Sequence, residues 1–148
     1  MYYLGKNEIL KDYKIGFLCS RKVPASIILK TYDWAIEQRE KGVCVVSGFH
    51  SKIEKDVFDI LAKGTQPIIL VLARRMMKRW DKKIIKLVDN GRLLIISPFN
   101  EKVIRPAKDT SLKRNKLIAE MCVKIFIPFS NDNGNLSHLK KNFEDKLI

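Results

Sequence analysis

Small polar and basic residues follow a short apolar segment near the start of this 148-residue chain. Residues 15–19 (Ile-Gly-Phe-Leu-Cys) are apolar. Ser20, Arg21 and Lys22 come directly after them, and a helical pattern begins shortly afterwards. Such a continuous apolar run is typical of a strand buried on both faces of a parallel sheet. Free backbone N–H groups and the dipole of the next helix favour anions there, and the two cations strengthen that field. We therefore expect a phosphate pocket at this point.

Further clusters suited to phosphate follow later apolar runs. The second run ends in a Ser-Gly pair, and the third leads into the most basic segment of the chain, at 74–83. A fourth cluster, at 113–116, is expected to open a helix whose first N–H groups are free. Basic clusters along one sheet edge would form a stripe long enough for a polynucleotide. The predicted nucleic-acid- or phosphate-binding residues are Ser20, Arg21, Lys22, Ser47, Gly48, His50, Lys52, Arg74, Lys113, Arg114, Asn115 and Lys116.

No catalytic residue is predicted, because no nucleophile or acid–base pair can be identified from the spacing. His50 and His138 are the only histidines, and neither is spaced with a cysteine or carboxylate as metal ligands are. His50 either touches a ligand or has no role. Glu54, Asp56 and Asp59 recur as on a solvated helix face that pairs with lysines. Neither a dinucleotide fingerprint nor a P-loop is present, so we expect no metal and no cofactor.

Three aromatic residues lie near the predicted strand ends or basic runs. Phe49, Trp80 and Phe99 could stack nucleobases, or they could belong to the hydrophobic core. We assign Phe99 to the core and leave both interpretations open for the other two.

The composition favours an anionic partner. Lys and Arg total 29 against 16 acidic residues, which gives a formal net charge of +13 at pH 7. A field of this size attracts polyanions, although a lysine-rich solvated surface would give the same count. No apolar run approaches the ~18 residues that span a bilayer. Cys19, Cys44 and Cys122 are odd in number, far apart and next to apolar runs, which predicts free buried thiols and a cytoplasmic protein.

Strand and helix patterns alternate along the chain after a lead-in at 1–13. Apolar runs predict strands at 15–19, 43–46, 67–72, 93–96 and 123–127. Periodic patterns predict helices at 24–41, at about 52–62, around 84–88 and at 112–121, and a turn at 130–135 precedes a last amphipathic helix. Right-handed crossovers then give one domain over 1–148, a Rossmann-like, doubly wound, mainly parallel five-stranded sheet with helices on both faces. We expect the strand order 3-2-1-4-5, a ligand at the carboxyl ends of the strands, and Ser20 and Arg114 on the same sheet edge.

Several of these segments together resemble the DprA/Smf DNA-processing family, part of a broader Rossmann-like superfamily. Residues 15–22 resemble its G-S-R strand end, and 42–48 (Gly-Val-Cys-Val-Val-Ser-Gly) look like its G-V-x-V-V-S-G. Residues 53–54 stand at its Ile-Asp, 90–97 resemble its N-G-x-x-x-S segment, and 114–119 are close to its R-N-R-x-I-A. Gly134, Asn135 and Leu136 fall at its Gly-Ser-Leu turn. The sequence departs from the family at Cys19, Ser51 and Lys52, which replace a Gly, an Arg and a Gly, and the match covers the core domain alone.

The resemblance implies a non-catalytic domain that binds single-stranded DNA in DNA processing and recombination. It also implies handover of the strand to a RecA-type recombinase, and a homodimer is possible. A sensor that binds a small nucleotide in the same pocket is the alternative. A nucleoside-phosphate glycosidase is the third reading, but its P-G-G-x-G-T-x-x-E pattern is missing.

Overall fold

The computed structural model describes residues 1–131 and 134–148, where strands and helices alternate. The strands in this part of the chain are β1 (Tyr2–Leu4), β2 (Lys14–Phe17), β3 (Cys44–Ser47), β4 (Ile68–Val71), β5 (Leu93–Ser97) and β6 (Lys124–Phe126). The helices are α1 (Ala25–Lys41), α2 (Lys52–Ala62), α3 (Lys82–Asp89), α4 (Lys108–Met121) and α5 (Asn135–Asn142), with short 3-10 helices η1 (Asn7–Lys11) and η2 (Glu144–Lys146). The predicted turn at 130–135 is described only at its two ends, because 132–133 lie outside the described residues.

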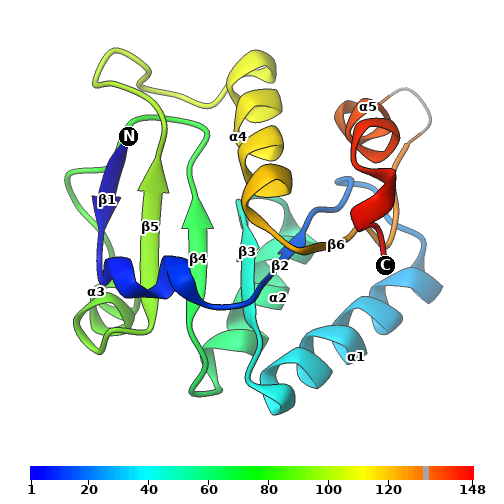
Figure 1. Cartoon of the computed structure of the whole chain (residues 1–148), viewed down its shortest axis with the longest axis horizontal. Coiled ribbons are helices and arrows are strands. Elements are labelled where there is room, and N and C mark those ends of the chain that lie inside the picture. Colours follow the sequence, from blue (N-terminus) through cyan, green and yellow to red (C-terminus); the bar gives the residue numbers. More distant parts are fainter. Residues whose placement is uncertain (132–133) are drawn as a thin grey trace.

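The strands form one sheet in the order β1-β5-β4-β3-β2-β6, which confirms the Rossmann-like class (Figure 1). The prediction of five strands was one too few for the described chain. Residues Tyr2–Leu4, expected to be part of a lead-in, pair antiparallel with β5 at the sheet edge, while the other neighbours pair in parallel. A three-residue edge strand is too short to give a periodic signal in the sequence.

The predicted strand order was wrong, because it placed the reversal of the sheet after the third parallel strand. The chain adds β3, β4 and β5 in one direction from β2, and only then returns to place β6 on the other side of β2. Helices α1, α2 and α3 all pack on one face of the sheet, whereas α4 and α5 pack on the other. Because crossovers are right-handed, the direction of growth reverses where the helix changes face, which here is at α4.

Two buried layers hold the sheet between its helices. Phe17, Val45 and Ile68 belong to the layer under α1, α2 and α3, and Val46, Ile69 and Ile125 to the layer under α4 and α5. Cys19, Cys44 and Cys122 are buried free thiols, as predicted, and burial raises the pKa of each to about 12. Phe99 is buried as well, as predicted.

Local signals set the helix ends. Gly42 ends α1 in the left-handed conformation, with φ of 72°. Ser51 and Glu54 form a capping box at the start of α2. Helix α4 begins at Lys108, four residues before the predicted start, where the Thr110 hydroxyl accepts a hydrogen bond from the Ala107 N–H at 2.8 Å. No helix in the described residues has both the length and the apolar character needed to cross a membrane.

Candidate nucleic-acid interface

Two cavities meet at the carboxyl ends of the parallel strands. The first, which we call the polar cavity, has a volume of about 310 Å³ and is lined by Ser20, Arg21, Glu54, Asn115 and neighbouring residues. The second, which we call the apolar cavity, has a volume of about 410 Å³ and is lined mainly by side chains of β4, α2 and the loop after β4. His50 and Arg114 line both cavities, so they stand at the junction between them.

The end of β2 forms one wall of the polar cavity. The chain leaves the strand through Cys19, and the Ser20 N–H donates to the carbonyl of Phe129 at 3.1 Å. The Ser20 hydroxyl accepts a hydrogen bond from the Asn131 N–H at 3.1 Å, so this side chain joins the loops after β2 and β6. Arg21 is exposed and lines the cavity. The loop therefore holds an exposed cation beside a hydroxyl that is fixed by a hydrogen bond.

Glu54 fixes the backbone on which this wall is built. Its side chain is only 5% exposed. One carboxylate oxygen accepts from the N–H groups of His50 and Ser51, at 3.0 and 3.1 Å, and the other accepts from the Cys19 N–H at 3.3 Å. Both oxygens are thus engaged by backbone donors, which ties the end of β2 to the start of α2. Arg21 forms no ion pair with Glu54 among the described residues.

Arg114 brings a buried cation to the junction. It is 8% exposed, and its Nε donates to Asn115 Oδ1 at 2.8 Å. Among the described residues, no carboxylate lies within ion-pair distance of its guanidinium. Burial lowers the pKa of Arg114, and the charge of Glu54 opposes that shift. An unpaired cation in such a place has unused capacity to bind an anion.

Gly48 makes room for this guanidinium. A Cβ atom built on Gly48 would lie within van der Waals overlap of Arg114 Nη1 and 2.6 Å from its Cζ. Gly48 therefore allows a close approach of the Arg114 guanidinium to the backbone, and it does not adopt an unusual φ angle.

His50 lines the polar cavity together with Arg21 and Arg114. Its pKa lies below the ordinary value, first because of partial burial and then because of the charges of Arg114 and Arg21, while Glu54 opposes the shift. The neutral imidazole consequently dominates at neutral pH. A bound anion at the junction would raise this pKa again.

The other predicted residues lie in different places. Arg74 lines the apolar cavity. Ser47 is fully buried, and its hydroxyl accepts a hydrogen bond from the Phe49 N–H at 3.2 Å. Lys52 is exposed and pairs with Asp56 at 2.8 Å. Lys22, Lys113 and Lys116 are exposed and line neither of the two cavities.

The expected role of the 113–116 cluster as a helix start was wrong. Because α4 begins at Lys108, Arg114 lies in the second turn, where backbone N–H groups are bonded within the helix. Arg114 reaches the junction through its side chain, and Asn115 supports that side chain. The side chains of Arg114 and Asn115 therefore line the polar cavity, although this stretch does not start the helix.

Several residues that line the two cavities were not predicted from the sequence. Met77 and Phe58 line the apolar cavity, and Ser111 and Asn131 line the polar cavity. Met77 stands inside the basic segment at 74–83, three residues before Trp80, which was the available clue. Within the described chain, no group of three His, Cys, Asp or Glu side chains is placed to hold a metal ion.

The chain matches one family and several solved structures. The model of the family described as DNA recombination-mediator protein A matches residues 1–139. No curated protein matches the sequence. DNA processing protein A from Helicobacter pylori, which has a single-stranded DNA binding mode, is 21% identical with a TM-score of 0.77, over 99% of this chain and 69% of that chain.

Two further structures share the fold. DNA processing protein A from Streptococcus pneumoniae is 19% identical with a TM-score of 0.77, over 97% of this chain and 51% of that chain. The molybdenum cofactor binding protein from Rippkaea orientalis is 14% identical with a TM-score of 0.61, over 93% of this chain and 75% of that chain. The chain thus spans 69% and 51% of the two DNA processing proteins.

Proposed function

Because the chain belongs to the DNA recombination-mediator protein A family, as its motifs predicted, we propose that it binds single-stranded DNA across the carboxyl edge of its sheet. The observation that carries this proposal is the buried Arg114 guanidinium at the junction of the two cavities, which has no carboxylate partner among the described residues. Phosphate oxygens would supply the acceptors that this group lacks. The likeness to the Helicobacter pylori protein, which binds single-stranded DNA, adds support.

We also propose that this binding involves no catalysis. A catalytic carboxylate needs an oxygen that is free to reach a substrate. Both oxygens of Glu54, the buried carboxylate of the polar cavity, are engaged by backbone N–H groups. Its geometry is that of a structural cap.

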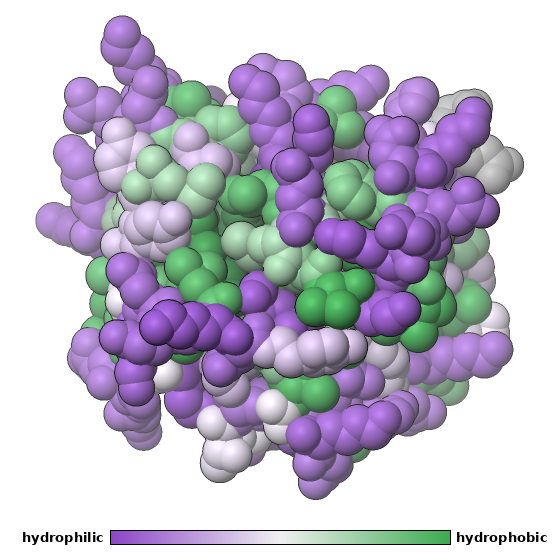
Figure 2. All heavy atoms as spheres, viewed as in Figure 1, coloured by the Kyte–Doolittle hydropathy of each residue, from purple (hydrophilic) through white to green (hydrophobic). Residues whose placement is uncertain are grey.

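A strand is favoured over a mononucleotide because the polar cavity continues into a third, larger cavity. This third cavity has a volume of about 1020 Å³ and shares Asn131, Gly134 and Asn135 with the polar cavity. Lys108, Lys140 and Lys141 line it. Figure 2 shows mostly hydrophilic side chains over the face that carries α4 and α5, with hydrophobic residues gathered towards its centre. A row of cavities with cations at both ends suits a polyanion longer than one nucleotide.

Changing Arg21 to Ala should reduce the salt dependence of single-stranded DNA binding. Each phosphate contact to a single strand contributes roughly 0.7 to the slope of log affinity against log salt concentration. We expect Arg21→Ala to lower the slope by about that amount and to weaken binding to all sequences alike. Fluorescence anisotropy titrations at several salt concentrations measure both quantities.

Lys52→Ala is the matched control, because Lys52 also carries one positive charge near the strand ends but is paired with Asp56 and lines neither the polar nor the apolar cavity. Its slope should equal that of the unchanged protein. If the unchanged protein, Arg21→Ala and Lys52→Ala all give the same salt slope, Arg21 does not contact a phosphate of the bound strand.

Binding should strengthen as the pH falls. In the free protein, burial and the charges of Arg114 and Arg21 lower the pKa of His50, while Lys55 adds to the shift and Glu54 opposes it. A phosphate at the junction raises that pKa, so the complex takes up a proton that the free protein does not hold. Affinity therefore rises severalfold as the pH falls from about 7 to 5.

This pH effect is measured in a His138→Gln background, so that His50 is the remaining histidine. His50→Gln in the same background should give a nearly flat profile. If both profiles have the same slope, His50 does not lie near the bound phosphate.

Handover of the strand to a RecA-type recombinase and assembly into a homodimer remain predictions that rest on the family relationship alone. The two DNA processing proteins compared above are longer than this chain, so their partners are not carried over from the shared fold.

A further inference from the structure

The positive charge of the chain is concentrated on one side of the sheet. Residues 63–107, which lie between α2 and α4, contain eleven Lys and Arg against three Asp and Glu. They carry +8 of the net charge of +13, whereas residues 25–62 contain five basic and six acidic side chains. Figure 1 places β1, β5 and α3 on the side of the sheet opposite to β6 and α5. That side attracts acidic partners.

A small cavity lies beside the edge strand β1. This cavity, which we call the edge cavity, has a volume of about 100 Å³, well below the roughly 300–1,000 Å³ of small-ligand sites. It has room for one side chain and not for a whole ligand. Its lining residues, none of which lines the polar, apolar or third cavity, are Tyr2, Arg75, Met76, Lys78, Phe99 and Glu101.

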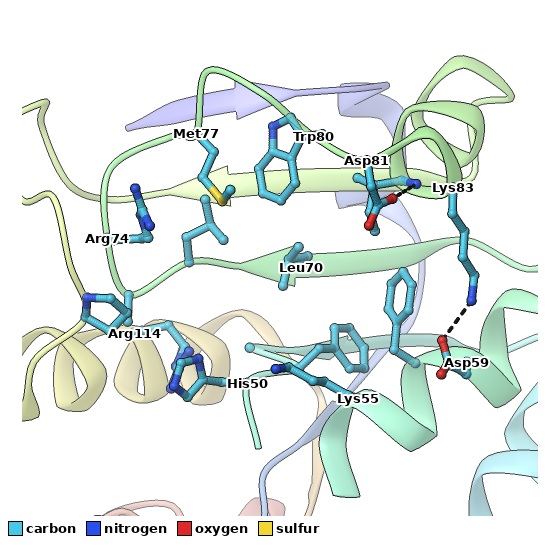
Figure 3. A pocket seen from close by; sticks show the side chains of 17 residues that line it. His50, Lys55, Asp59, Leu70, Arg74, Met77, Trp80, Asp81, Lys83 and Arg114 are labelled. Atoms are coloured by element: carbon cyan, nitrogen blue, oxygen red, sulfur yellow. Dashed lines mark hydrogen bonds and ion pairs between the residues drawn. The ribbon is translucent and has the colours of Figure 1, made fainter. Parts of the chain in front are cut away.

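The basic segment after β4 divides its side chains between two cavities. Figure 3 shows Arg74, Met77 and Trp80 at the apolar cavity. Arg75 and Met76 line the edge cavity instead. Because the two sets of side chains are separate, the edge cavity can be occupied while a strand lies at the proposed DNA interface.

Hydrogen bonds fix the shape of the edge cavity. The Arg75 N–H donates to the Val103 carbonyl at 2.7 Å, which joins the loop after β4 to the loop after β5. The Ser97 hydroxyl accepts from the Phe99 N–H at 3.2 Å and donates to the Arg74 carbonyl, which joins the same two loops a second time. A site whose backbone is already fixed loses less conformational entropy when it binds a partner.

The cations of the edge cavity have unused capacity to bind an acid. Neither Arg75 nor Lys78 forms an ion pair among the described residues, although Glu101 lines the same cavity. The Nε atom of Arg75 is buried and has no hydrogen-bond acceptor in the described part of the chain. Buried donors are normally paired. A carboxylate from another molecule would supply the missing acceptor.

The apolar residues of the edge cavity are incompletely covered. Phe99 is 8% exposed, Met76 is partly buried and Tyr2 is 51% exposed. Tyr3 and Met1 add further exposed apolar surface on the same short strand and just before it. An aliphatic or aromatic side chain that entered the cavity would remove part of this surface from water, as anchor residues do in protein interfaces.

We propose that the edge cavity docks an acidic segment of another protein that carries one aliphatic or aromatic anchor residue. The anchor enters between Tyr2, Met76 and Phe99. Carboxylates next to the anchor pair with Arg75 and Lys78. The inference is independent of the proposed function, because no residue of the edge cavity lines the cavities assigned to DNA.

The test titrates the full chain, labelled with nitrogen-15, with three capped heptapeptides. The first has leucine at the centre and aspartate at all flanking positions. Alanine replaces the leucine in the second, and lysine replaces the aspartates in the third. We expect the leucine peptide to bind about tenfold more tightly than the alanine peptide, because a larger aliphatic side chain is buried. The lysine peptide should not bind, and the amide signals that shift should be those of residues 2, 75–78 and 99–101.

Two charge reversals form a matched pair. Lys78→Glu and Arg79→Glu each reverse one exposed charge in the same segment, but only Lys78 lines the edge cavity. Lys78→Glu should weaken the leucine peptide about tenfold, and Arg79→Glu should have a much smaller effect.

A charge placed inside the cavity tests the anchor site directly. Met76→Asp should abolish binding of the leucine peptide, because it sets a carboxylate where the apolar anchor enters. Met76 is partly buried, so Tyr2→Asp, at a more exposed residue, gives the same test if Met76→Asp fails to fold.

Several results would overturn the docking site and leave the proposed function standing. Equal affinity for the leucine and alanine peptides would show that the cavity takes no anchor. Shifts confined to Ser20, Arg21 and Asn115 would show that an acidic peptide only occupies the polar cavity. Displacement of the leucine peptide by oligothymidylate or by a short duplex would assign the edge cavity to nucleic acid. If the peptide binds as expected and no DNA binds, the proposed function fails and the docking site stands.

Discussion

Arg114→Met weakens single-stranded DNA binding about ten- to hundredfold, because a hydrogen bond to a charged group contributes roughly 1.5–3 kcal/mol. The same change should alter the melting temperature only slightly, because relief of the buried charge is offset by loss of the hydrogen bond from Arg114 Nε to Asn115. Burial lowers the pKa of Arg114, which means that the folded protein holds this charge at a cost. Methionine fills similar space without that cost. Thermal melts and binding titrations on the same samples give both values.

Gly48→Ala offers an independent route to the same result. The added methyl group would overlap the Arg114 guanidinium, which is the flexible end of its side chain and can move. Binding should therefore fall towards the level of Arg114→Met, with only a small loss of stability. If Arg114→Met lowers the melting temperature by several degrees and binds DNA normally, Arg114 is a structural residue.

Glu54→Gln is expected to have the largest effect on stability. The amide would replace one acceptor oxygen with an N–H donor that faces the backbone N–H groups of Cys19, His50 or Ser51. Loss of charge-assisted hydrogen bonds and an orphaned buried donor together cost about 2–4 kcal/mol. A fall of roughly 5–10 °C in the melting temperature follows for a chain of this size.

Glu37→Gln is the matched control for this change. Glu37 is exposed on α1 and pairs with Lys41 four residues later. Exposed pairs of this kind contribute only about 0.3–0.5 kcal/mol, so its melting temperature should barely change. If Glu54→Gln is as stable as Glu37→Gln but abolishes a hydrolytic activity on nucleotides, the carboxylate is catalytic and the non-catalytic proposal is wrong.

The fold class could be predicted because buried parallel strands leave a strong signal. Apolar runs such as 93–96 contain no polar residue, and glycines such as Gly42 mark helix ends. The strand order could not be predicted in the same way. It depends on which face α3 packs against, and an apolar stripe containing Ile84 and Leu87 would suit either face.

The candidate site could be predicted where it follows directly from a strand end. Ser20 and Arg21 come after β2, and both line the polar cavity. Ser47 also ends a strand, but its side chain points into the protein, and the alternation of strand side chains was not visible in a run of buried residues. The position of Arg114 depends on the true start of α4, which is set by Thr110.

Binding of unpaired and paired nucleic acid by the unchanged protein is the most direct test of the account. A single strand, its duplex and a nucleoside monophosphate are titrated at several salt concentrations. We expect the single strand to bind most tightly, with log affinity falling linearly as log salt concentration rises, and the monophosphate to bind weakly. Equal affinity for duplex and single strand, or monophosphate binding as tight as that of the strand and insensitive to salt, would contradict a single-stranded DNA interface at Arg114.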